Sequence, residues 1–122
     1  MPKSADILLY GSDARLLQTR LLILQAAGFA VSLVQSLKDA KQTLAGDAPK
    51  VLVLCHTLLP DERTTLLKLA HARPQVRTLL LEGVGHADLI GERDEVLPRY
   101  RGPKELVKAV TRLAALAEGD AA

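Results

Sequence analysis

Short apolar runs alternate with longer amphipathic segments along the chain, and each run ends at polar residues, glycine or proline. The central run, residues 51–55, lies between Pro49 and Pro60. Such a short, bounded run is typical of a strand that is buried on both faces. Strands covered on both faces occur mostly in parallel sheets flanked by helices. We therefore expect an α/β protein in which His56 and Thr57 follow the carboxyl end of the central strand.

Turn and capping residues divide the chain into five predicted strands and five predicted helical segments. Ser12 or Asp13 can cap the first helix and Ser36 the second, while Gly28 can end the first helix. The strands are predicted at residues 6–10, 29–34, 51–55, 78–81 and 96–97, and the helices at residues 14–27, 37–45, 62–72, 87–92 and 104–117. The helix at 87–92 is expected to be short or irregular because glycines flank it.

This alternation predicts a single three-layer αβα sandwich. Right-handed crossovers between parallel strands give a five-stranded parallel sheet with flavodoxin-like (βα)5 connectivity. A length of 122 residues suits one domain with a real core, and an aromatic content of 2% makes that core aliphatic. We expect the domain to span residues 1–122, with its core at about 5–117 and a short frayed tail from Glu118.

Composition and charge exclude several classes of partner. The formal net charge is +2, and lysine and arginine alternate with acidic residues, which argues against a nucleic-acid surface on this domain alone. The single cysteine, Cys55, provides neither a disulfide framework nor a thiolate metal site. No apolar stretch approaches the length of a membrane span, and the N-terminus lacks a signal-peptide core. We expect a cytoplasmic protein without a cofactor or a membrane partner.

The order of elements and their flanking residues resemble the receiver domain of bacterial response regulators over residues 5–116. Residues 7–13 and the helix that ends in Ala-Ala-Gly-Phe resemble the family's opening strand, acidic pair and first helix. Residues 51–60 resemble its central strand, in which the phosphorylated aspartate stands four residues before a proline. Residues 99–106 resemble the segment in which Lys-Pro leads into the final helix. The resemblance implies the receiver fold.

The residues that carry receiver chemistry are replaced at each matching position. Gly11 and Ser12 stand where the acidic pair holds Mg²⁺, with Asp13 next to them, and His56 stands at the phosphoacceptor aspartate. The other replacements are Glu82 for the hydroxyl residue, Val96 for the aromatic switch residue, Arg99 for the lysine and Tyr100 for the proline after it. A chain without these carboxylates cannot form an acyl phosphate and has little to hold the metal. The resemblance therefore implies a degenerate receiver, or pseudo-receiver, that has lost aspartyl phosphorylation.

An alternative is a small-ligand or metal-binding protein that uses the same crevice. Asp13, His56 and Glu82, with His86 as a further candidate, should converge at the strand ends, where open α/β sheets bind ligands. Carboxylates and imidazole can bind a divalent metal, but none of these residues belongs to a tight ligand motif, and a polar rim exposed to water is the simpler interpretation. Glu82 and Arg99 can instead pair with each other across an empty phosphoryl site.

Two apolar features indicate contact surfaces. The first helix is more apolar than a solvated helix requires, through Leu16, Leu22 and Ile23, and a contiguous patch there would mark an interface. Receivers use a surface built from the final helix and the strand before it, and this resemblance implies an interaction surface here. Its candidate residues are Leu106, Val110 and Leu113.

These features predict a protein that binds a partner and does not catalyse a reaction. No nucleophile is paired with a base, so we do not expect an enzyme. We expect a stand-alone signalling module of a two-component phosphorelay, which binds another signalling protein or its own copy without a phosphorylation cycle. This expectation depends on fold-level analogy.

Overall fold

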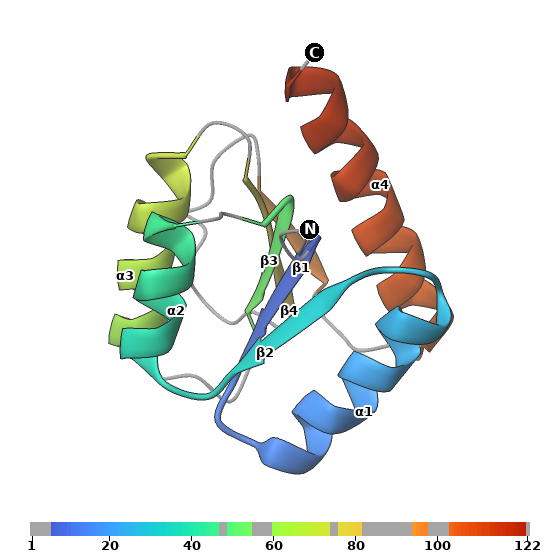
Figure 1. The fold of residues 1–122 in the computed structure, drawn as a ribbon, viewed down its shortest axis with the longest axis horizontal. Helices are drawn as coiled ribbons and strands as arrows, with labels where there is room; N and C mark the ends of the chain where they lie inside the picture. The colour runs from blue at the N-terminus through green and yellow to red at the C-terminus, as the bar shows by residue number, and fades with distance from the viewer. Residues whose placement is uncertain are drawn as a thin grey trace.

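A parallel β-sheet with helices on both faces forms the protein, as seen in a computed structural model (Figure 1). The structure describes residues 6–46, 49–54, 60–73, 76–81, 94–97 and 103–121. The elements are β1 (Ile7–Tyr10), α1 (Ala14–Ala26), β2 (Val31–Val34), α2 (Leu37–Ala45), β3 (Val51–Leu54), α3 (Pro60–His71), β4 (Arg77–Leu81), β5 (Asp94–Leu97) and α4 (Pro103–Ala121). The strand order is β2-β1-β3-β4-β5, and all four neighbouring pairs are parallel.

The predicted αβα architecture with a parallel sheet is confirmed, but the full (βα)5 count is not. Among the described residues there are four helices, and the segment predicted as a short or irregular helix, residues 87–92, lies outside them. Helices α3 and α4 begin at Pro60 and Pro103, slightly earlier than predicted. Proline suits the first turn of a helix because its missing N–H would have no partner there. Helix α4 continues to Ala121, past its predicted end at residue 117, and the predicted fraying of the tail stays a prediction.

Each strand sends alternate side chains to opposite faces of the sheet, and this produces two aliphatic cores. The core between the sheet and helices α1 and α4 contains Ile7, Leu9, Val51, Val53, Leu79 and Leu81 from the strands. The core on the side of α2 and α3 contains Leu8, Tyr10, Leu52, Leu54 and Leu80. Figure 1 shows the two helix pairs on either side of the strands. No helix in the described part of the chain is long and apolar enough to span a membrane.

Gly28 sets the turn from α1 into β2. Its φ of +98° is in the left-handed region that side chains rarely adopt. Two backbone hydrogen bonds close this end of the helix, from Gly28 N to Gln25 O at 3.0 Å and from Phe29 N to Leu24 O at 3.2 Å. These two bonds form a Schellman motif. The predicted end of α1 at this glycine is confirmed.

The apolar face of α4 belongs to the core. Leu106 and Val110 are fully buried and Leu113 is 4% exposed, all three in the cluster shared with α1 and the sheet. Their spacing of i, i+4 and i+7 places them on one side of the helix, and that side packs against the strands. The prediction that these three residues form an interaction surface is therefore wrong for the folded chain, because a partner could reach them only if α4 left the sheet.

Candidate functional site

The carboxyl end of β1 leads directly into the N-terminus of α1 through Gly11, Ser12 and Asp13. Gly11 is buried, whereas Ser12 and Asp13 are exposed. Asp13 has extended backbone geometry, and its Oδ1 accepts hydrogen bonds from the backbone N–H groups of Arg15 at 3.0 Å and Leu16 at 3.2 Å. Asp13 is therefore the N-cap of α1, as one of the two predicted candidates. Ser36 caps α2 in the same way, as predicted, by accepting from the N–H of Asp39 at 3.1 Å.

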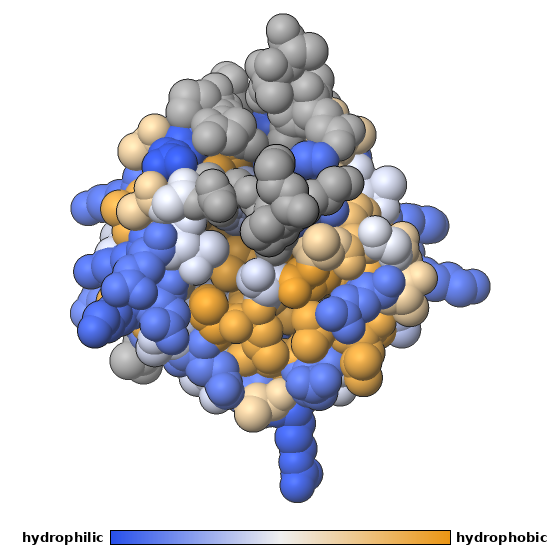
Figure 2. Space-filling view, in the orientation of Figure 1, coloured by the Kyte–Doolittle hydropathy of each residue, from blue (hydrophilic) through white to orange (hydrophobic). Residues whose placement is uncertain are grey.

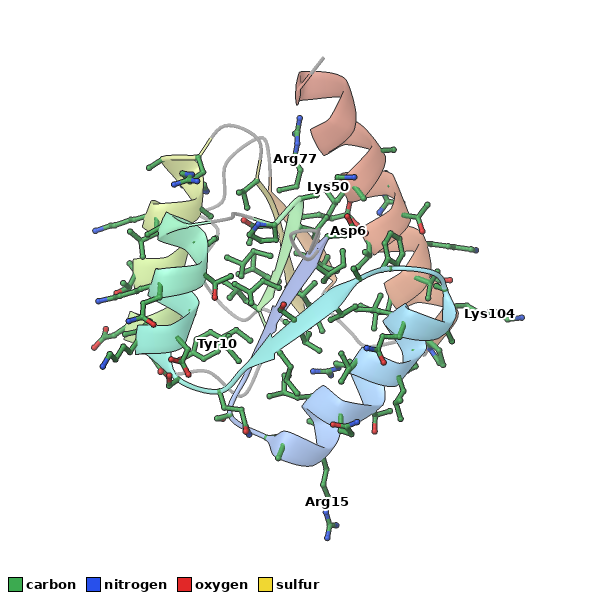
Figure 3. The ribbon with its side chains drawn as sticks, viewed as in Figure 1. Asp6, Tyr10, Arg15, Lys50, Arg77 and Lys104 are labelled. Carbon is green, nitrogen blue, oxygen red and sulfur yellow. The ribbon has the colours of Figure 1, made fainter. Side chains whose placement is uncertain are left out.

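Tyr10 and Glu62 form a polar contact beside this turn that the sequence did not indicate. Tyr10 is the last residue of β1 and is 1% exposed, and its hydroxyl donates to Glu62 Oε2 at 2.7 Å (Figure 3). Burial, and then the hydrogen bond and the charge of Glu62, raise the pKa of Tyr10 well above its usual value. The phenol therefore stays protonated and remains a donor. Because Glu62 lies in the first turn of α3, this bond links the end of β1 to the start of α3.

The described part of this edge does not fit a magnesium ion. Gly11 has no side chain and Ser12 has no carboxylate, so Asp13 is the only acid in the turn. Its Oδ1 already accepts two backbone N–H groups, as an N-cap does. Among the residues that the structure describes, no group of three or more His, Cys, Asp or Glu side chains could hold a metal ion. This stretch cannot supply the oxygen cage that a divalent cation needs.

Several predicted site residues lie outside the described ranges. They are His56, Glu82, His86, Arg99 and Tyr100, so their convergence with Asp13 and the predicted pairing of Glu82 with Arg99 stay predictions. The backbone of Val96 is described, and it stands in register with Leu80 in the β4–β5 pair. This register places position 96 in the last strand, as predicted.

The exposed side of α4 and the strand β5 form a second candidate region. Arg112 donates from Nε to Glu95 Oε1 at 3.1 Å and from Nη2 to Glu95 Oε2, so one guanidinium joins α4 to β5 through two hydrogen bonds. Lys108 Nζ lies 3.8 Å from Glu105 Oε1 one turn away on the same helix. Part of the outward surface of α4 is therefore charged, and some of that charge is paired within the domain.

Comparison with solved structures identifies the architecture. A response regulator receiver domain protein (CheY-like) from Methanospirillum hungatei matches with a TM-score of 0.76 and 17% sequence identity, over 93% of this chain and 95% of that one. A response regulator receiver protein from Sinorhizobium medicae matches with a TM-score of 0.78 and 24% identity, over 91% and 94% of the two chains. The chain has the receiver-domain fold.

The same fold also matches part of a longer protein. The NtrX protein from Brucella abortus matches with a TM-score of 0.75 and 15% identity, over 95% of this chain but 27% of that one. No protein-family model matches the sequence, and neither does any curated protein. At these identities the likeness establishes the fold, and function has to be argued from the residues of this chain.

Proposed function

We propose that this chain is a receiver-like, non-enzymatic signalling module of a two-component system that binds another protein without being phosphorylated. The observation that carries the proposal is the turn after β1, where the receiver fold has Gly11 and Ser12 instead of acids, and Asp13 caps α1. His56 at the position that matches the acceptor aspartate supports the same conclusion, because imidazole cannot form an acyl phosphate.

The proposed loss of phosphorylation follows from the shortage of carboxylates in the turn after β1. Phosphoryl transfer depends on positioning and on metal ions that neutralise the phosphate oxygens. Asp13 alone cannot provide the several oxygen ligands of such a metal while its Oδ1 accepts from Arg15 and Leu16. The domain would therefore keep one conformation at this edge, with β1 and α3 joined by the Tyr10–Glu62 hydrogen bond.

Reaction with a small phosphodonor tests the proposal. The full chain is incubated with acetyl phosphate and Mg²⁺, and its intact mass is measured beside a response-regulator receiver domain that has the acceptor aspartate. We expect the control to gain one phosphoryl group and this chain to keep its mass. A Mg²⁺-dependent gain of one phosphoryl group, removed by hydroxylamine as an acyl phosphate is, would contradict the proposal.

A further inference from the structure

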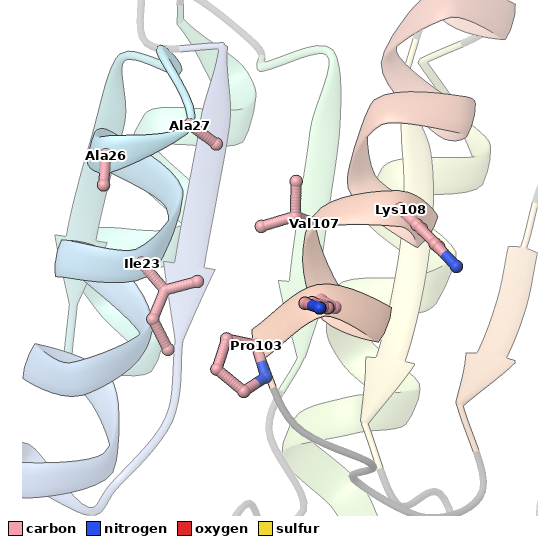
Figure 4. Close-up of a pocket in the computed structure, with 7 residues that line it drawn as sticks. Ile23, Ala26, Ala27, Pro103, Val107 and Lys108 are labelled. Atoms are coloured by element: carbon pink, nitrogen blue, oxygen red, sulfur yellow. The ribbon is translucent and has the colours of Figure 1, made fainter.

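An open apolar groove lies between the last turn of α1 and the first two turns of α4, at the opposite end of α1 from Asp13. Its volume is about 550 Å³ (Figure 4). Ile23, Ala26 and the C-cap residue Ala27 line it at the end of α1, and Pro103 and Val107 line it from α4. Figure 4 shows Ile23 and Pro103 facing each other across the groove and Val107 pointing toward α1. Two helices that pack in the core below are therefore separated at the surface.

Small side chains keep the groove open. Ala26 and Ala27 are both exposed and leave the α1 wall without any long side chain at its C-terminal end. Leu22, one turn before Ala26, is 57% exposed and extends the apolar surface along the helix. Figure 2 shows a gathering of apolar side chains on the face of the molecule that carries β2 and α1. Contiguous apolar patches on a protein surface are typical of interaction sites.

The charged residues that line the groove are both basic. The other two lining residues are Lys104 and Lys108, both exposed and both on α4, and none of the seven lining residues is acidic. Lys104 extends away from the domain (Figure 3) and makes no ion pair within the described residues, while Lys108 is paired with Glu105 on its own helix. A partner that places carboxylates along this rim would therefore gain attraction at Lys104 without breaking an existing contact.

The same charges argue against a second copy of this chain in the groove. A two-fold dimer through this surface would place the same patch on both sides of the interface. Both copies would then bring Lys104 into the interface without an ion-pair partner among the described residues, since the nearby carboxylate of Glu105 is paired with Lys108. Like charges placed together in an interface disfavour it.

In a second groove, between α2 and α3, one of the two cations is already engaged by the domain itself. This groove is lined by apolar residues including Leu44 and Leu69, and its cations are Lys41 and Arg73. The guanidinium of Arg73 donates to the carbonyl oxygens of Ala45 at 3.3 Å and Gly46 at 3.0 Å, so it already closes the end of α2. The Arg73 guanidinium is therefore bound by backbone carbonyls of the domain, whereas the Lys104 ammonium makes no ion pair within the described residues.

We propose that the α1/α4 groove is the docking site for an amphipathic helix of a partner protein, one whose apolar stripe is flanked by glutamate or aspartate. A helix laid into an apolar groove with three or four anchoring side chains is a common mode of recognition. This inference rests on the proposed function as a binding module, and it names the surface and the chemistry of the partner. The apolar stripe would fill the space between Ile23 and Val107, and the acids would face Lys104.

The test uses two synthetic helical peptides and the full chain labelled with ¹⁵N. Both peptides carry leucines at i, i+3 and i+7; one has glutamates beside the leucine stripe and the other has lysines at the same positions. We expect the glutamate peptide to shift the amide signals of Ile23, Ala26 and Val107 saturably, with an affinity that falls as salt is raised. The lysine peptide should bind at least about tenfold more weakly because its charges repel Lys104 and Lys108.

Charge reversal at Lys104 provides the matched variant. Lys104→Glu should weaken the glutamate peptide about tenfold, while Lys41→Glu in the α2/α3 groove should leave its affinity unchanged. An acid in the first turn of α4 complements the helix dipole, so Lys104→Glu should keep the fold. Ala26→Gln, which fills the groove without changing charge, should weaken binding as well and supplies an independent check.

Three results of the peptide titrations would overturn the inference. They are absence of binding, equal affinity for the two peptides, and shifts that fall on the α2/α3 groove. A dimer of the free chain that the Ala26→Gln variant abolishes in sedimentation experiments would assign the groove to a second copy and would also overturn it. A chain that takes up a phosphoryl group yet binds the peptide contradicts only the proposed phosphorylation-independent function. A chain that stays unphosphorylated and ignores the peptide contradicts only this inference.

Discussion

The two ends of helix α1 differ in their contacts. Polar groups at the N-terminal end form hydrogen bonds within the domain, whereas apolar side chains at the C-terminal end are exposed to solvent. At the N-terminal end, Asp13 caps the helix and the Tyr10 hydroxyl is bonded to Glu62. At the C-terminal end, Ala26, Ala27 and Leu22 are exposed beside a groove with lysines on one wall. Polar contacts within the domain therefore occupy the N-terminal end of α1, and the groove that we propose as a binding site lies at the other end of the same helix. This difference is what we expect if, as we propose, the domain has lost the receiver reaction and kept a surface for recognition.

We expect the largest change in stability at Leu106, and a much smaller one at its neighbour Val107. Leu106 is fully buried in the core, whereas Val107 is half-buried and lines the groove. Leu106→Ala should lower the free energy of unfolding by about 2–5 kcal/mol, because it removes buried methyl groups and leaves a cavity. Val107→Ala should cost less than about 1.5 kcal/mol, since that side chain is already in contact with water. Urea denaturation followed by circular dichroism measures both values.

A Leu106→Ala variant that is as stable as wild type but no longer binds the glutamate peptide would contradict the assignment of Leu106 to the core and Val107 to the groove. It would restore Leu106, Val110 and Leu113 as a contact surface and would remove the reason for placing the site in the groove.

The next effect concerns Tyr10 at the closed end of α1. Tyr10→Phe keeps the ring but removes the donor to Glu62, so we expect a loss of about 1–2 kcal/mol in the free energy of unfolding. The wild-type chain should also lose stability in alkali. Because the folded-state pKa of Tyr10 is raised, its contribution is full below pH about 10, where the unfolded phenol begins to ionise, and falls as the pH rises further.

The free energy of unfolding of wild type and of Tyr10→Phe is measured by denaturation at pH 8 and again above pH 10. The difference in stability between wild type and Tyr10→Phe should narrow at the higher pH. A difference that widens with pH would show that the hydroxyl is not held as a protonated donor.

A smaller change in stability is expected at Asp13, and it distinguishes a helix cap from a metal ligand. Asp13→Ala should destabilise the chain by about 1 kcal/mol, and Asp13→Asn by a few tenths, because the amide oxygen can still accept from the N–H groups of Arg15 and Leu16. Thermal melts with and without Mn²⁺ or Zn²⁺ complete the test. We expect no metal-dependent rise in Tm for wild type. A rise that Asp13→Asn abolishes would favour the metal-binding alternative.

The smallest effect is expected at the ion pair between β5 and α4. Arg112 is 54% exposed and Glu95 is 27% exposed, so solvent screens most of their attraction. A double-mutant cycle with Arg112→Ala and Glu95→Ala should give a coupling energy of at most about 1 kcal/mol. A larger coupling energy would indicate that this pair holds β5 in place. The outer side of α4 would then be closed by its own contacts in the way that the N-terminal end of α1 is.

Local signals in the sequence were sufficient for most of the fold. The apolar run that became β3, the left-handed Gly28 and the cap at Asp13 each follow from chain neighbours alone. The apolar stripe of α4 was found correctly but given the wrong role, because periodicity shows that a face is apolar and not whether the sheet covers it.

Features that join distant segments could not be predicted in this way. Tyr10 and Glu62 are 52 residues apart, and nothing near either one indicates the other. The groove needs two alanines on one helix to face a proline and a valine on another, which depends on how α1 and α4 are placed on the sheet. The predicted roles of His56, Glu82, Arg99 and Tyr100 stay predictions, since these residues lie outside the described ranges.

The most direct test of the central claim is an NMR titration of the ¹⁵N-labelled full chain with Mg²⁺ and beryllofluoride, which mimics an aspartyl phosphate. If the receiver fold has kept recognition and lost the reaction, the amide signals of Tyr10, Gly11 and Asp13 will not move at any concentration. A saturable shift of these signals that requires both Mg²⁺ and beryllofluoride would contradict that claim.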